Sequence, residues 1–121
     1  MKKKVLIIED NELNLKLVRC VLKLGEFETM VAKTAEKGIQ LAREYQPDLI
    51  LMDIQLPGMD GLEATRRIKD DDNLNSIAIV ALTSYAMQGD EQKAFDSGCI
   101  GYITKPIDTR SFLSEISKYL R

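Results

Sequence analysis

Five short apolar runs recur along the chain at intervals of roughly 20 to 30 residues, and a helical pattern follows each of them. The first, third and fourth runs are almost continuous in valine, isoleucine and leucine. That composition is typical of strands that are buried on both faces of a parallel sheet. The pattern therefore predicts strands at residues 5–8, 27–32, 49–52, 77–82 and 100–104.

Amphipathic stretches fill the intervals between these runs. On the first predicted helix, Leu13, Leu17 and Val21, together with Val18 and Leu22, form an apolar stripe at i, i+4 and i+8. Two later stretches have similar spacing. They comprise Ile39, Ala42 and Tyr45 after the predicted N-cap Thr34, and Phe112, Leu113, Ile116 and Leu120 after the predicted N-cap Asp108. Gly25 and Gly98 stand where helices are expected to end.

This alternation predicts an α/β fold: a doubly wound (βα)5 domain with a five-stranded parallel sheet and helices on both faces. We expect the flavodoxin-like strand order 2-1-3-4-5, which is taken from known doubly wound folds rather than derived from the pattern. A chain of 121 residues has room for one domain, so residues 1–121 are expected to form a single unit.

Composition narrows the range of functions. The chain carries 17 basic and 19 acidic residues, a balance that argues against nucleic acid as the main partner. No apolar stretch approaches the ~18 residues of a membrane span, and the N-terminal apolar run is too short for a secretory signal. We therefore expect a cytoplasmic protein without a membrane partner. Cys20 and Cys99 form no CxxC pattern and are expected to be ordinary thiols.

Histidine is absent from the sequence. This absence excludes Ser–His and Cys–His nucleophilic catalysis, zinc held by histidine, and a role as a phosphohistidine donor. Carboxylates, hydroxyls and lysine must carry any chemistry.

Such residues stand at the ends of four predicted strands. Because ligands of open parallel sheets bind beyond the carboxyl ends of the strands, we expect these side chains to meet at one edge. They are Glu9 and Asp10 after the first strand, Asp53 after the third, Thr83 and Ser84 after the fourth, and Lys105 after the fifth.

Three carboxylates at one edge repel each other, and a hard divalent cation would resolve that conflict. An all-oxygen ligand set suits Mg²⁺. Lys105 and the Thr83 hydroxyl could hold phosphoryl oxygens, and Asp53 could attack phosphorus as a carboxylate nucleophile. The group predicts a site that forms an acyl phosphate.

Each residue taken alone also has an ordinary structural explanation. Asp10 could cap the first helix, and Asp53 could start a turn with Pro57. A threonine after a strand is usually structural, and Lys105 before a proline indicates only a turn. The coincidence of all four at corresponding strand ends favours the functional interpretation.

The motifs that carry these residues resemble the receiver domains of bacterial two-component response regulators, and the chain is similar to a stand-alone member of that family. The resemblance covers residues 4–120 and is strongest at residues 5–11, 47–53, 56–61, 81–83 and 102–106. It implies that Asp53 is the phosphoacceptor and that the backbone carbonyl of Gln55 joins Glu9, Asp10 and Asp53 around Mg²⁺.

The resemblance also assigns roles to residues near this site. Thr83, Ser84 and Lys105 would bind the phosphoryl group, and Tyr102 would be the aromatic switch residue. Gln55 and Tyr85 would set the lifetime of the acyl phosphate, and Lys105 would be joined to Pro106 by a cis peptide. Ser84 stands where alanine is commoner, and Ala78 stands where many receivers have proline.

The implied partners are proteins. A sensor histidine kinase or a histidine phosphotransfer protein would supply the phosphoryl group, and the signal would leave by contact with a downstream protein. The chain would catalyse only its own phosphorylation and dephosphorylation, as a monomer or weak dimer. The sequence leaves open whether it is complete or part of a hybrid kinase.

Three other functions compete with this interpretation. A Mg²⁺-dependent phosphohydrolase would be expected to carry a DxD pattern, whereas Asp53 is followed by Ile54 and Gln55. A flavodoxin-like redox module would need a phosphate-binding loop where Glu9 and Asp10 stand. A binding domain that had lost phosphorylation would not be expected to keep the acidic residues.

Overall fold

The computed structural model describes residues 2–83, 90–105 and 107–120. Its five strands are all parallel and lie in the order β2-β1-β3-β4-β5, which confirms the predicted topology. The strands are β1 (Lys4–Ile8), β2 (Glu28–Ala32), β3 (Leu49–Asp53), β4 (Ala78–Thr83) and β5 (Gly101–Thr104). The helices are α1 (Glu12–Leu24), α2 (Ala35–Tyr45), α3 (Gly61–Asp70), α4 (Asp90–Ser97) and α5 (Phe112–Tyr119).

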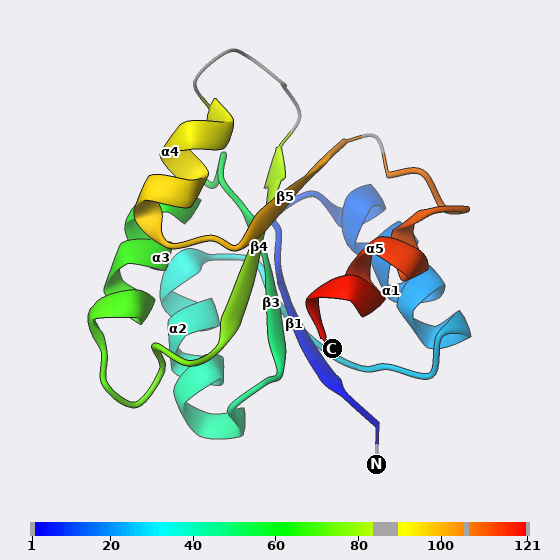
Figure 1. Cartoon of the computed structure of the whole chain (residues 1–121), viewed down its shortest axis with the longest axis horizontal. Helices are drawn as coiled ribbons and strands as arrows, with labels where there is room; N and C mark the ends of the chain where they lie inside the picture. Colours follow the sequence, from blue (N-terminus) through cyan, green and yellow to red (C-terminus); the bar gives the residue numbers. More distant parts are fainter. Residues whose placement is uncertain (1, 84–89, 106, 121) are drawn as a thin grey trace.

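Helices cover both faces of the sheet, with α2, α3 and α4 on one side and α1 and α5 on the other (Figure 1). Alternate residues of β1 enter different cores. Leu6 and Ile8 pack in the cluster beneath α2 and α3, whereas Val5 and Ile7 pack in the cluster beneath α1 and α5. Because both faces are covered, the central strands carry apolar residues at consecutive positions and not at alternate ones.

The buried face of α1 differs from the predicted stripe. The helix buries Leu15, Val18, Val21 and Leu22, whereas Leu13 is 76% exposed and Leu17 is 36% exposed. Successive helical residues turn by about 100°, so Leu13 and Leu17 project from the side opposite Leu15 and Leu22. The prediction was therefore right for three of the five positions it named, Val18, Val21 and Leu22, and wrong for the other two.

Helix ends follow local side-chain chemistry. Thr34 caps α2 as predicted, with its hydroxyl accepting from the Lys37 N–H. The cap of α1 is Asn11, so Asp10 is not used for that purpose. Asp108 was wrongly predicted to cap the last helix: α5 begins at Phe112, and the Asp108 carboxylate accepts from the Arg110 N–H in the preceding turn.

Two further sequence expectations can be compared with the structure. Ile39 and Ala42 are buried on α2, but Tyr45 is exposed because the helix ends there. Within the described residues, no helix combines the length and the apolar character that crossing a membrane requires.

Candidate functional site

Three carboxylates meet at the carboxyl ends of the central strands. Glu9 and Asp10 follow β1, Asp53 is the last residue of β3, and these two strands are neighbours in the sheet. Oxygen atoms of the three side chains lie within 4.8 Å of one another. Glu9 and Asp53 are buried and Asp10 is exposed, so the cluster opens to solvent at Asp10. The predicted acidic site is therefore assembled by the fold.

Lys105 completes the cluster from the far side of β4. Its Nζ lies 2.5 Å from Oε1 of Glu9 and 3.4 Å from Oδ2 of Asp53. The Lys105 N–H donates to the carbonyl of Thr83 at 2.7 Å, and this bond fixes the turn after β5 over the end of β4. Thr83 is itself buried beside this turn.

The site holds more negative than positive charge. Burial raises the pKa of Glu9, and the adjacent Asp53 carboxylate raises it further, while the Lys105 ammonium opposes both effects. Within the described part of the chain, three carboxylates share this one ammonium group. A divalent cation would supply the missing charge, and the all-oxygen donor set fits Mg²⁺.

The turn after β3 orients Asp53. Its Oδ1 accepts from the Gln55 N–H at 2.9 Å, which leaves Oδ2 facing Lys105. Asp53 thus starts a turn and also takes part in the site. Gly61, the first residue of α3, packs against this turn so closely that a Cβ there would lie 2.3 Å from the Asp53 carbonyl oxygen. Only glycine permits this contact without a shift of the backbone.

The remaining predicted residues fall into two groups. Gln55, two residues after Asp53, has an exposed side chain. Tyr102 on β5 packs edge to face against Phe95, with ring centroids 6.1 Å apart. A hydrogen bond with Glu91 raises the pKa of Tyr102 and links the ring to α4. Ser84, Tyr85, Pro106 and the peptide between Lys105 and Pro106 lie outside the described residues.

Two asparagines that were not among the predicted site residues contact Glu9. The Asn14 side-chain amide donates to Oε1 of Glu9, and the Asn11 N–H donates to Oε2, both at 3.3 Å. Their position in the sequence could have indicated this contact, because an asparagine at the start of a helix is expected to lie near the strand end that precedes the helix. Only the fold shows that these groups face Glu9.

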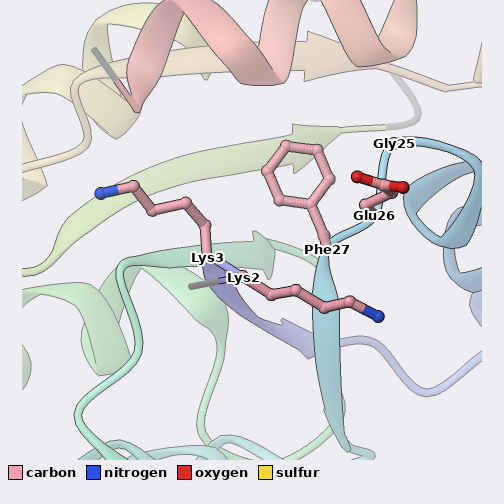
Figure 2. Close-up of a pocket in the computed structure, with 5 residues that line it drawn as sticks. All are labelled: Lys2, Lys3, Gly25, Glu26 and Phe27. Carbon is pink, nitrogen blue, oxygen red and sulfur yellow. The ribbon is translucent and has the colours of Figure 1, made fainter.

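A hollow of about 440 Å³ lies elsewhere, at the amino ends of β1 and β2 (Figure 2). It is lined by Lys2, Lys3, Gly25, Glu26 and Phe27. The strands place this hollow at the opposite end of the sheet from Glu9 and Asp53. Within the residues that the structure describes, clustered charge marks the candidate site.

Comparisons with known proteins agree with this geometry. A family model described as the response regulator receiver domain matches residues 5–117. The chain is 48% identical over 120 residues to the polar-differentiation response regulator DivK of Brucella anthropi, covering 99% of this chain and 98% of that protein. This similarity agrees with the expected resemblance to a stand-alone regulator.

Two of the solved structures that share this fold are also related to the chain in sequence. The receiver domain of sensor histidine kinase PA1611 from Pseudomonas aeruginosa, with a magnesium ion coordinated in its active-site cleft, is 28% identical with a TM-score of 0.91, covering 99% of this chain and 98% of that one. A co-crystal structure of the Saccharomyces cerevisiae phosphotransfer protein Ypd1 and the Ssk1 receiver domain contains a chain that is 33% identical to this one, with a TM-score of 0.90. The match covers 98% of this chain and 88% of that chain.

Proposed function

This chain belongs to the response regulator receiver family of two-component signalling, and from that premise we propose that Asp53 is the residue that accepts the phosphoryl group. The observation that carries the proposal is the convergence of Asp53, two further carboxylates and Lys105 at one edge of the sheet. A buried carboxylate beside a lysine and an open acidic cluster has the chemistry of a phosphoacceptor.

We propose that Glu9, Asp10 and Asp53, with the carbonyl of Gln55, hold Mg²⁺ at this edge. When bound, the ion would neutralise charge on the phosphoryl oxygens during transfer. The clustered oxygens of this chain support the proposal, as does the magnesium ion in the PA1611 receiver domain.

Residues of the chain would carry out the attack on phosphorus and bind the transferred phosphoryl group. An Asp53 carboxylate oxygen forms the new bond to phosphorus as the bond from phosphorus to the donor's histidine nitrogen breaks. Lys105, which pairs with Glu9 and Asp53 before transfer, would bind a phosphoryl oxygen afterwards. The Thr83 hydroxyl, with Ser84, would donate to another phosphoryl oxygen.

The donor histidine must lie outside these 121 residues, since they contain no histidine. A sensor kinase or a phosphotransfer protein would approach beside α1, which starts two residues after Asp10. Leu13 and Leu17 project from this helix into solvent and would form the apolar part of the contact. The Ypd1–Ssk1 complex supports this class of partner.

The phosphorylated state would be signalled to a downstream protein through Thr83 and Tyr102, which connect the site to the surface. Movement of Thr83 toward the phosphoryl group would change the position of Tyr102, which contacts α4 through Phe95 and Glu91. A downstream protein would recognise the altered surface of β4, α4, β5 and α5.

Incubation with acetyl phosphate and Mg²⁺, followed by mass spectrometry of the intact protein, tests the proposal. We expect a gain of one phosphoryl group that disappears in excess chelator and in Asp53→Asn. Asparagine keeps the shape of the side chain and removes a negative charge from a crowded site, so the stability of the variant should be unchanged or slightly higher. Labelling of Asp53→Asn at the wild-type rate would show that another residue is the acceptor.

A further inference from the structure

The Glu9 carboxylate is held by the start of α1 as well as by the charges of the site. One oxygen, Oε1, accepts from the Asn14 amide, and the other, Oε2, accepts from the Asn11 N–H. Glu9 itself is completely buried. Both oxygens of a buried carboxylate are therefore anchored by the same helix end.

This anchoring modifies a familiar helix-capping arrangement. The Asn11 side chain accepts from the Asn14 N–H at 3.0 Å, so Asn14 occupies the third position of the helix. A capping box would place a glutamate or glutamine there, whose side chain accepts from the cap N–H. Here the acceptor is Glu9, supplied from the preceding strand end, and the residue at the third position is a donor that faces it.

The two donors constrain which way Glu9 points. Its side chain has several rotatable bonds, and Lys105 alone would let the carboxylate turn with the flexible lysine. The Asn14 amide is attached to a helix that is packed on the sheet through Leu15 and Val18. It therefore gives Oε1 a second partner, carried on a helix that is packed against the sheet.

We propose that Asn14 is a positioning residue for the metal centre, holding Glu9 in the orientation in which its carboxylate faces Asp10 and Asp53. The inference rests on the proposed function, since it assumes that these carboxylates bind Mg²⁺. Partners that orient the ligands of a metal typically change its affinity by about 10- to 100-fold when they are removed. Asn14 lies at the edge of the site, so we expect the lower end of that range.

The test compares Mg²⁺ affinity with stability in two variants of Asn14. Asn14→Ala removes the amide, and Asn14→Leu removes it while keeping most of its volume; both residues are good helix formers. Mg²⁺ dissociation constants are measured by isothermal titration calorimetry, and unfolding midpoints are measured in excess chelator. We expect affinity to fall about tenfold in both variants, with a much smaller fall in their midpoints in chelator, because Glu9 keeps the Asn11 N–H and Lys105 as partners.

Asn73→Ala serves as the matched control, since Asn73 lies in the loop between α3 and β4. Its Mg²⁺ affinity should equal that of the wild type. Wild-type affinity in both Asn14 variants would overturn the inference, and so would a loss of affinity accompanied by an equal loss of stability in chelator. If the wild-type protein itself fails to bind Mg²⁺, the proposed metal site is wrong. That measurement on the wild type alone distinguishes this outcome from a failure of the inference about Asn14.

Discussion

Replacement of Lys105 by methionine isolates the electrostatic balance of the site. The lysine Nζ pairs with Glu9 at 2.5 Å and with Asp53 at 3.4 Å. The three side chains are only 9%, 1% and 4% exposed, so water screens these pairs poorly. Methionine preserves most of the apolar length of the side chain and removes the ammonium group, leaving two buried carboxylates side by side.

Removing one partner of a buried ion pair typically costs about 3–5 kcal/mol, because an uncompensated charge remains in the interior. We expect Lys105→Met to lower the free energy of unfolding by about 3 kcal/mol in chelator, the lower end of that range. The reason is that Glu9 can take up a proton when its counter-ion is removed. Mg²⁺ should raise the free energy of unfolding of the variant above its value in chelator, since an ion at 100 times its dissociation constant stabilises the folded state by about 2.7 kcal/mol.

The assay is urea unfolding followed by circular dichroism, in chelator and with Mg²⁺. The matched control is Lys33→Met, because Lys33 pairs with Glu12 on the exposed surface. Exposed pairs contribute about 0–1 kcal/mol, so this variant should differ little from the wild type. Equal losses in the two lysine variants would refute the reasoning, as would a Lys105→Met protein as stable as the wild type in chelator.

The pH dependence of the free energy of unfolding, measured in chelator, gives a second test of the same reasoning. The pKa of Glu9 is raised in the folded state, so the folded protein binds a proton more readily than the unfolded chain between the ordinary value of 4.5 and the raised one. Stability therefore falls as pH rises through that interval. Loss of Lys105 removes the group that opposes this shift, and the deficit of Lys105→Met should be smaller at pH 5 than at pH 8. A deficit that does not change with pH would contradict this account.

Three further predictions concern other parts of the structure. Gly61→Ala should reduce stability by about 1–3 kcal/mol and slow labelling by acetyl phosphate, since its Cβ would press on the Asp53 backbone; wild-type values for both would contradict the packing. Cys20 is exposed, whereas Cys99 is buried and burial raises its pKa, so one thiol per native chain should react rapidly with Ellman's reagent and a second only after denaturation. Tyr85→Ala should speed loss of the phosphoryl label several-fold if tyrosine shields Asp53 from water, because about 1.4 kcal/mol of barrier is a factor of ten in rate; unchanged decay after donor removal would show that it does not.

The sequence alone determined the alternating α/β architecture and the members of the acidic cluster, whereas the strand order was taken from known doubly wound folds. Runs such as residues 49–52 are apolar at every position because helices cover both faces of the sheet, and this leaves a pattern that is visible without coordinates. Glu9 and Asp53 could be paired in advance because parallel strands bring their carboxyl ends to one edge.

Only the tertiary structure decided which way the individual side chains face. On α1, leucines occur on more than one side, so periodicity alone did not show that Leu15 is buried and Leu13 is exposed. That choice depends on where the helix lies on the sheet, which long-range packing decides. The contact between Asn14 and Glu9 and the reach of Lys105 across β4 arise in the same way, because each joins groups whose separation depends on the folded chain and not on local preference.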